Sequence, residues 1–196
     1  MLVFLDYIPS TSISYCRQLA EKYEFDFILK KNRSTKLGDF RHNKTNGQFI
    51  ISVNNNLNQY QFLLTFIHEL AHLKVALEYP RREKAHGNEW KQAFQMLLEP
   101  VLNTEVFPEP LLSVLERHMR NPKAAAGSDP KLWLALKDFN QEADDCILNT
   151  LADGSSFIFK KKQFVRIEKR RTRILCREVR SKRLYLIPGI ADIKLV

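Results

Sequence analysis

Residues 59–79 read QYQFLLTFIHELAHLKVALEY, and this stretch decides the fold of the chain. It is apolar over most of its helical circumference, which is typical of a buried helix at the centre of a domain. Asn58 precedes it as a predicted N-cap, Gln61 completes a capping-box-like pair, and Pro80 ends it. We therefore predict one long helix here, around which the rest of a domain packs.

Two histidines and a carboxylate interrupt this apolar helix, in the run His68-Glu69-Leu70-Ala71-His72. Because His68 and His72 are four positions apart, their imidazoles share one face and can bind a single cation. Glu69 is turned by about 100° from His68, beside the metal, where a general base for water is expected. Such polar groups are costly in a buried helix without a partner. The run therefore predicts a Zn²⁺ site with Glu69 as the catalytic base.

A catalytic zinc needs a third protein ligand and an open position. The next histidine is His86, with 13 residues between it and His72, where a polar loop meets the predicted helix NEWKQAFQMLL. A loop of this length can return a side chain to the first two ligands, so we predict His86 as the third. Glu83 and Glu89 are the alternatives. For Glu89, a first-turn carboxylate that stabilises the new helix is the favoured interpretation.

The segments around the long helix predict a mixed domain. Residues 9–23 repeat apolar residues at helical spacing, whereas EFDFILK, KLGDFR and GQFIISVN have strand character. We expect the strands to form a small antiparallel sheet. NEWKQAFQMLL, LLSVLERHM and KLWLALKDF predict further helices. Trp90, Phe94 and Leu97 are predicted as core rather than as a substrate platform, and His42 and His118 as surface residues rather than ligands.

The net charge lies entirely in the last quarter of the chain. Residues 151–196 hold 13 Lys or Arg and four Asp or Glu, which accounts for the whole net charge of +9, while residues 1–150 hold 18 of each. SSFIFK, QFVRIEK, TRILCREV, RLYLI and DIKLV predict four or five strands in this region, in a small barrel or curled sheet. Such segregation suggests a module that faces a polyanion.

Cations alternate with apolar residues in these strands, which would set a basic face opposite a buried one. We predict salt-sensitive contacts with nucleic-acid phosphates; a solvated surface or a docking face for an acidic protein are the alternatives. The predicted contact residues are Lys160, Lys161, Lys162, Arg166, Lys169, Arg170, Arg171 and Arg173.

Composition and motifs exclude several classes of protein. Cys16, Cys146 and Cys176 are odd in number and widely spaced, which argues against a disulfide framework and a cysteine-rich zinc ribbon. The first residues, MLVFLDYIPS, lack a basic start and a long apolar run, so they do not resemble a signal peptide. No stretch approaches the roughly 20 apolar residues that span a bilayer. We expect a cytoplasmic protein that is not embedded in a membrane.

His-Glu-x-x-His followed by His86-Gly87-Asn88-Glu89-Trp90 resembles the SprT family of zinc metalloproteases, which includes the DNA–protein crosslink protease Spartan. The resemblance covers about residues 10–120 and includes the glycine-containing strand pair upstream. It differs from the compact metzincin pattern, because Val75 and Glu78 stand where that pattern has glycine and histidine. It differs from many bacterial members in lacking the terminal four-cysteine zinc ribbon.

The sequence as a whole predicts an α+β chain. For residues 1–125 the resemblance implies a minimal zincin-like domain, with a small antiparallel sheet and helices around the His-Glu-x-x-His helix. The local patterns predict a connector with a short helix at residues 126–150 and a small basic all-β module at residues 151–196. The implied function is cleavage of proteins associated with or crosslinked to DNA. A zinc-stabilised nucleic-acid adaptor without proteolysis is the alternative, and a site that uses another ion or hydrolyses a non-peptide bond is the third.

Overall fold

The computed structural model describes residues 2–33, 35–43, 45–79, 84–124, 129–140 and 146–196. They form two compact units, Met1–Phe139 and Asn140–Val196. Each unit has helices or strands around its own apolar cluster. The prediction of an α+β chain is confirmed.

The first unit contains a three-stranded sheet of mixed direction. Its strands are β1 (Asp26–Lys30), β2 (Gly38–Asn43) and β3 (Gln48–Asn54), in the order β1-β3-β2. β2 is antiparallel to β3, but β1 is parallel to it. The prediction of a purely antiparallel sheet was therefore wrong. Lys30, at the end of β1, accepts a hydrogen bond from the Asn55 N–H, and Leu37, just before β2, accepts one from the Asn54 N–H. β1 therefore ends and β2 begins at the carboxyl end of β3, on opposite sides of that strand.

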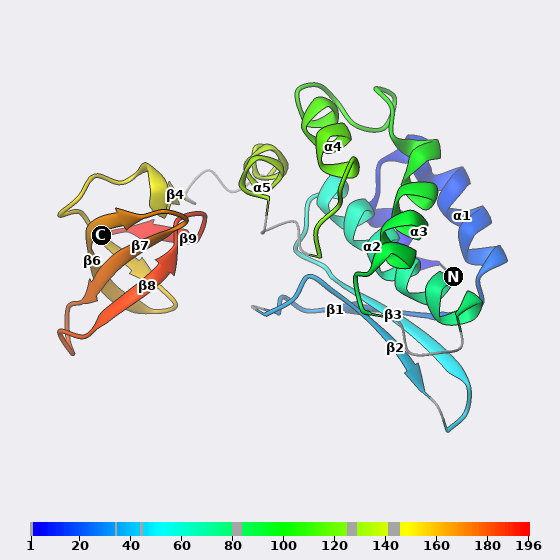
Figure 1. The fold of residues 1–196 in the computed structure, drawn as a ribbon, viewed down its shortest axis with the longest axis horizontal. Coiled ribbons are helices and arrows are strands. Elements are labelled where there is room, and N and C mark those ends of the chain that lie inside the picture. Colours follow the sequence, from blue (N-terminus) through cyan, green and yellow to red (C-terminus); the bar gives the residue numbers. More distant parts are fainter. Residues whose placement is uncertain (1, 34, 44, 80–83, 125–128, 141–145) are drawn as a thin grey trace. The chain divides into compact units, whose positions relative to one another are not determined.

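Helices cover one face of this sheet (Figure 1). They are α1 (Ile13–Lys22), α2 (Gln59–Glu78), α3 (Asn88–Leu98), α4 (Leu111–Met119) and α5 (Pro130–Lys137), with short 3-10 helices η1 (Val3–Tyr7), η2 (Ser10–Ser12) and η3 (Glu99–Val101). α2 is the central helix, as predicted, and almost every residue from Phe62 to Leu73 is buried. The Asn58 side chain caps it by accepting a hydrogen bond from the Gln61 N–H at 3.0 Å.

The short helix α5 belongs to the first unit rather than to a connector. Leu132 and Leu136 are fully buried in the same apolar cluster as α2, and Asn58 donates a hydrogen bond to the Leu136 carbonyl at 2.8 Å. The predicted connector at 126–150 is thus divided, because the burial of this apolar face holds residues 130–139 in the first unit.

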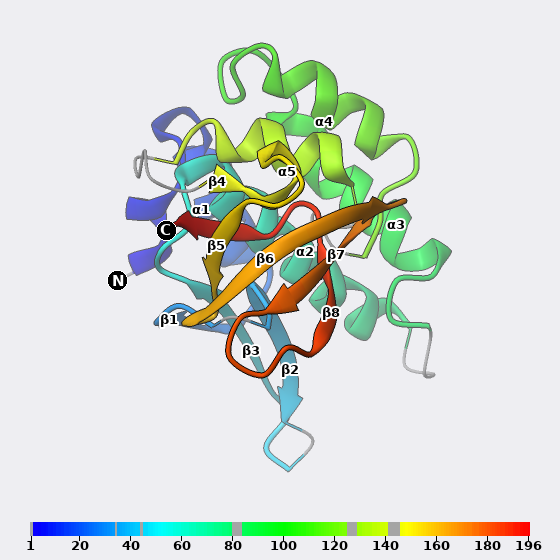
Figure 2. The same ribbon diagram turned by 90° about the vertical axis from the view of Figure 1, so that its left-hand side faces the viewer.

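The second unit is a six-stranded sheet, whose central strands face the viewer in Figure 2. The strand order is β4-β9-β5-β6-β7-β8, and all the neighbouring pairs are antiparallel. The strands are β4 (Cys146–Ile147), β5 (Ser156–Phe159), β6 (Lys162–Arg170), β7 (Arg173–Glu178), β8 (Leu184–Pro188) and β9 (Asp192–Leu195), with a 3-10 turn, η5 (Leu148–Thr150). Five of these strands match predicted segments, and β4 was missed because it is only two residues long.

All three cysteines are free, and Cys16 and Cys176 are buried. In the described part of the chain, no helix is both long and apolar enough to cross a membrane.

Candidate metal centre

The three predicted histidine ligands converge on one point. The Nε2 atoms of His72 and His86 are 3.1 Å apart, and those of His86 and His68 are 3.3 Å apart. His68 and His72 come from one face of α2, and His86 comes from the turn before α3. Among the described residues, these three form the one cluster of His, Cys, Asp or Glu side chains with ligand atoms close enough to hold a metal ion.

The spacing of the nitrogens matches tetrahedral coordination. With metal–nitrogen distances of about 2.0–2.1 Å, two imidazole ligands of a tetrahedral site lie about 3.3 Å apart. In each of the three side chains, Nε2 is the nitrogen that lies close to another histidine of the cluster. Three protein ligands leave a fourth tetrahedral position for water or substrate. The side chains present therefore fit a tetrahedral cation with one open position.

The surroundings keep the imidazoles neutral, as metal ligation requires. Burial, with smaller contributions from neighbouring histidines, lowers the pKa of His68 to about 3 and that of His72 to about 4. Burial also lowers the pKa of His86. Near neutral pH all three side chains can therefore offer a lone pair without first losing a proton.

Trp90 forms a wall behind the cluster. Its ring centroid lies 4.6 Å from that of His68, 5.5 Å from His72 and 4.7 Å from His86. Its indole N–H donates to the His68 carbonyl at 3.3 Å. Trp90, Phe94 and Leu97 are buried, as predicted, but the position of Trp90 shows that it also restrains the ligands. Its place four residues after His86 was the available signal in the sequence.

Glu69 is buried beside the edge strand β2. Only 7% of the residue is exposed. Burial and the nearby Asp39 raise the pKa of its carboxyl group to about 8, while a hydrogen bond from the Phe40 backbone opposes that rise. In the metal-free site this carboxyl group is therefore largely protonated near neutral pH, and the positive charge of a bound cation would favour the carboxylate that a general base requires.

Gly38 allows β2 to approach Glu69 this closely. A Cβ atom at Gly38 would lie 2.5 Å from Glu69 Oε1 and 2.7 Å from Thr65 Cγ2, well inside van der Waals contact. A glycine within a strand often marks such a close approach. The glycine was visible in KLGDFR, but what it contacts could be learned only from the structure.

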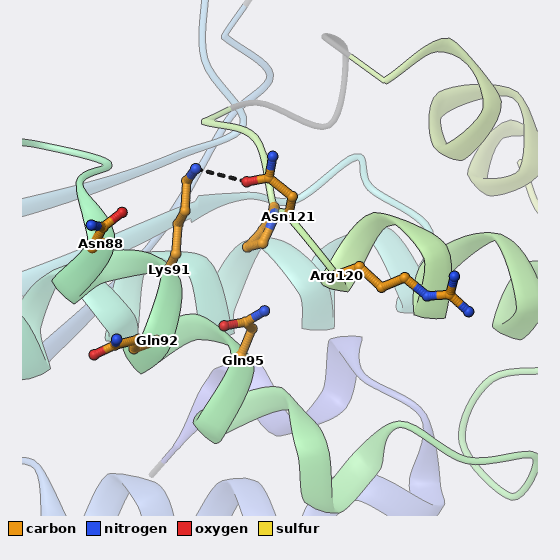
Figure 3. Close-up of a pocket in the computed structure, with 7 residues that line it drawn as sticks. Asn88, Lys91, Gln92, Gln95, Arg120 and Asn121 are labelled. Atoms are coloured by element: carbon orange, nitrogen blue, oxygen red, sulfur yellow. Dashed lines mark hydrogen bonds between the residues drawn. The ribbon is translucent and has the colours of Figure 1, made fainter.

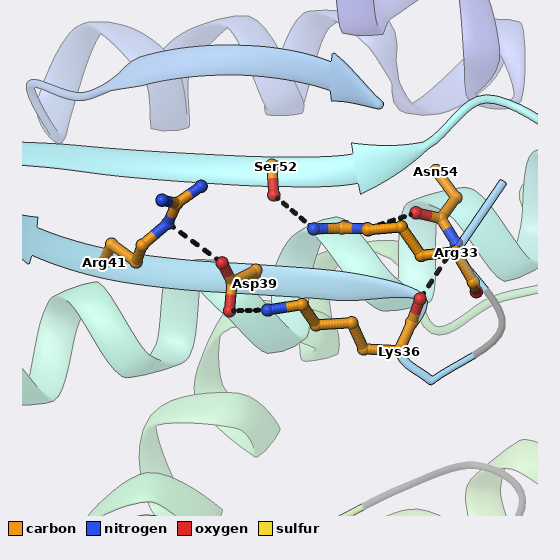
Figure 4. A network of polar contacts seen from close by, with 6 residues as sticks. All are labelled: Arg33, Lys36, Asp39, Arg41, Ser52 and Asn54. Atoms are coloured by element: carbon orange, nitrogen blue, oxygen red, sulfur yellow. Dashed lines mark hydrogen bonds and ion pairs between the residues drawn. The ribbon is translucent and has the colours of Figure 1, made fainter. Parts of the chain in front are cut away.

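A polar network fixes the start of β2 (Figure 4). Arg33 donates to the Asn54 side chain at 2.7 Å and to Ser52 at 3.1 Å. Asp39 forms salt bridges with Lys36 at 2.8 Å and with Arg41 at 3.0 Å. Arg33 and Lys36 lower the pKa of Glu69, and Asp39 raises it. The network therefore sets both the position of the strand and the local charge.

Of the other histidine and glutamate candidates, the described ones considered next do not join the cluster. Glu83 lies outside the described residues. Glu89 lies in the first turn of α3, as the favoured interpretation had it. His42 is exposed and packs on Phe49 with ring centroids 4.6 Å apart.

The prediction that His118 is a surface residue was wrong, although it does not belong to the metal cluster. Its side chain is buried and forms a 3.0 Å contact with Asp129. Asp129 is the N-cap of α5 and also accepts a hydrogen bond from the Leu132 N–H. His118 is thus one of the α4 residues that pack into the first unit, and local sequence does not reveal this packing.

A polar cavity of about 160 Å³ lies elsewhere on α3. Asn88, Lys91, Gln92 and Gln95 line it from the helix, and Lys91 donates to Asn121 at 2.7 Å (Figure 3). With 100° per residue, these positions fall on the helix face opposite Trp90. The cavity is therefore separate from the metal cluster.

The residues predicted to contact phosphate in the second unit differ in their burial and in their salt-bridge partners. Arg166 is buried, donates to the Leu151 carbonyl at 2.5 Å and pairs with Asp153 at 2.8 Å, so it does not belong to an exposed basic face. Lys162 pairs with Glu178, and Arg170 with Glu168. Lys162 and Arg170 are nevertheless exposed, and so are the other predicted contacts: Lys160, Lys161, Lys169, Arg171 and Arg173.

The exposed cations lie at both ends of the long strand β6. Lys160 and Lys161 form the turn before it, Arg171 begins the turn after it, and all three have positive φ. Nine residues of strand span roughly 30 Å. The predicted basic segment is therefore divided between two ends of the sheet rather than gathered in one patch.

Comparisons with protein-family models, with curated proteins and with solved structures found no match to this chain.

Proposed function

We propose that this chain is a SprT-like zinc metallopeptidase that cleaves proteins associated with nucleic acid. The observation that carries the proposal is the convergence of His68, His72 and His86, with Nε2 atoms 3.1 and 3.3 Å apart. Three neutral imidazoles with an open fourth position are the ligand set of a catalytic rather than a structural zinc. A structural site would have four protein ligands.

A zinc ion held by these residues would act as a Lewis acid, making water nucleophilic near pH 7 and polarising a carbonyl group. Glu69 would take a proton from the water molecule while the water oxygen attacks the peptide carbonyl carbon. It would return that proton to the amine nitrogen as the carbon–nitrogen bond breaks. Gly38 and the Phe40 backbone would hold the Glu69 carboxylate in place.

The decisive experiment compares Glu69→Gln with Glu89→Gln. Purified zinc-loaded protein is incubated with DNA and a DNA-binding substrate protein, and cleavage is followed by mass spectrometry. Glu69→Gln should retain its zinc but lose at least about 10²-fold in rate, because it removes the general base. Glu89→Gln should cleave like the wild type. If Glu69→Gln cleaves or cleaves itself as fast as the wild type, the mechanism is wrong.

The same protein preparations address the other functions. If neither protein cleaves any substrate, while His72→Ala loses its zinc and its ability to bind nucleic acid, the chain is a zinc-stabilised adaptor. Metal analysis that finds fewer than about one zinc per chain, with no loss of stability in chelator, would exclude the zinc site.

The nucleic-acid part of the proposal rests on the exposed cations of the second unit. Phosphate contacts release counterions, so the affinity for DNA should fall steeply with added salt. Lys160→Gln with Lys161→Gln should reduce that slope, whereas Arg166→Gln should not, because Arg166 is buried. An affinity that does not change with salt would contradict phosphate binding.

A further inference from the structure

The strand β8 forms one edge of the second unit, and it is unusually apolar for that position. β8 follows β7 at the end of the strand order, with no further strand beside it among the described residues. Its sequence, Leu184-Tyr185-Leu186-Ile187-Pro188, has no charged residue. Exposed edge strands are commonly protected by charges, because their free N–H and C=O groups can pair with another chain. Here Pro188 protects only the end.

The register places an aliphatic cluster on the face of the sheet away from the core. Leu184 is 60% exposed and Leu186 is 48% exposed. Leu186 lies opposite Leu175, so these side chains share one face. The alternate residues Ile174, Cys176 and Ile187 point to the other face and are buried there. Leu184 and Leu186 therefore play no part in the core.

Arginines surround this cluster on the same face. Arg177 lies opposite Leu184, and Arg173 opposite Pro188, and both arginines are exposed. Neither forms a salt bridge with any described residue. The one carboxylate that the register places nearby, Glu168 opposite Leu175, is already paired with Arg170 at 2.7 Å. The face thus combines exposed leucines with uncompensated positive charge.

We propose that the β8 edge binds an extended, acidic, aliphatic segment of a partner protein by strand addition. Backbone hydrogen bonds between the segment and the free edge would supply affinity. Every second side chain of the segment would contact the exposed face of the sheet and supply specificity. Aliphatic side chains of the segment would cover Leu184 and Leu186, and its carboxylates would meet Arg173 and Arg177. This inference concerns the second unit alone and does not depend on the metal centre.

Charge and side-chain type select this occupant over two others. A second copy of the chain would add the same exposed arginines to this face and no carboxylate to compensate them, and like charges repel each other. Single-stranded nucleic acid is typically held by bases stacked on aromatic rings. The outward face of β8 presents leucines, while Tyr185 alternates to the other face, where its hydroxyl donates to Glu178 at 3.1 Å.

The test uses the full chain and fluorescently labelled peptides. One peptide alternates glutamate with valine, a second alternates lysine with valine, and an oligo-dT strand serves as the nucleic acid. We expect the glutamate peptide to bind more tightly than the lysine peptide and to weaken with added salt. Equal binding of the two peptides, or no binding of the glutamate peptide, would overturn the proposal.

Variants locate the binding surface. Leu184→Thr with Leu186→Thr introduces β-branched residues that suit a strand. It should weaken binding of the glutamate peptide about tenfold, because the apolar contact is lost. Ile158→Thr with Leu195→Thr changes two exposed apolar residues on other strands and should bind as the wild type. Arg177→Gln should weaken binding several-fold, and Lys194→Gln, an exposed position on β9, should not.

Three results would assign the edge differently and reject the proposal. These are unchanged peptide binding by the double leucine variant, loss of oligo-dT binding in that variant without any peptide binding, and a dimer that the variant abolishes. Circular dichroism and thermal unfolding check each variant. Because both leucines are exposed, their replacement should cost within about 0.5 kcal/mol.

Discussion

The two units differ in where their candidate functional side chains lie, which is inside the first unit and mostly on the surface of the second. In the first unit, His68, His72 and Glu69 lie within a helix that is almost entirely buried, and burial shifts the pKa of each. In the second unit, most of the cations are exposed on strands and turns, and Arg166 is the buried exception.

The difference indicates two kinds of recognition. A buried cluster has its geometry fixed by packing, so it can hold a single ion at defined distances. Exposed cations act through long-range attraction that salt screens, and they tolerate small changes in position. The first unit should therefore be sensitive to changes in volume, and the second to changes in charge and salt.

The largest expected effect is a loss of stability when the Trp90 ring, which packs against the three histidines, is removed. Trp90→Ala removes a fully buried ring and should cost about 3–5 kcal/mol of unfolding free energy. Met96→Ala, an exposed position on the same helix, is the matched control and should cost within about 0.5 kcal/mol. Urea unfolding measures both. A Trp90→Ala protein as stable as the control would contradict the role of packing in the first unit.

In metal-free Glu69→Gln protein, the free energy of unfolding should fall as the pH is lowered. The pKa values of His68 and His72 are about 3 and 4, well below their ordinary 6.5. The unfolded chain therefore binds protons first, so stability is full above about pH 6.5 and falls as the pH falls toward 4.

Glu69 has the opposite effect on how the free energy of unfolding depends on pH. Its pKa is raised to about 8 from 4.5, so its contribution is present below pH 4.5 and lost as the pH rises through 8. Wild-type protein should accordingly lose less stability on acidification than Glu69→Gln. Urea unfolding with chelator at several pH values checks this, and identical pH profiles would contradict the burial of these groups.

A smaller effect is expected at Gly38. Gly38→Ala places a methyl group against Glu69 and Thr65 and should cost about 1–3 kcal/mol. It should also slow the proposed reaction about 10²-fold by displacing the base, while zinc content is retained. Gly154→Ala in the second unit meets no atom within 4 Å but has a φ of +88°. It should cost about 1 kcal/mol and leave cleavage unchanged.

The smallest effect distinguishes the buried cation of the second unit from its exposed neighbours. Arg166→Met loses the contacts with Leu151 and Asp153 and should cost about 1–2 kcal/mol, since Asp153 itself remains solvated. Arg177→Met should change stability by less than about 0.5 kcal/mol. Equal costs in thermal unfolding would mean that burial does not separate the two arginines.

Local patterns predicted the helices and most strands because each depends on residues close in sequence. Asn58 caps α2 as expected by accepting a hydrogen bond from the Gln61 N–H, and NEWKQAFQMLL forms α3 over its full length. Long-range packing caused the failures. The parallel β1–β3 pair joins strands with more than fifteen residues between them, and the buried His118 contacts Asp129, the N-cap of α5, eleven positions after it.

The sequence alone determined which side chains could bind a metal. The spacing of His68 and His72 is a property of any α-helix, and the polar loop before His86 was long enough to return to them. Only the tertiary structure decided that the third histidine reaches the other two at 3.1 and 3.3 Å, that Gly38 lies against Glu69, and that Arg166 turns inward. These distances join residues far apart in the chain. They are fixed by how complete helices and strands pack, which no local pattern specifies.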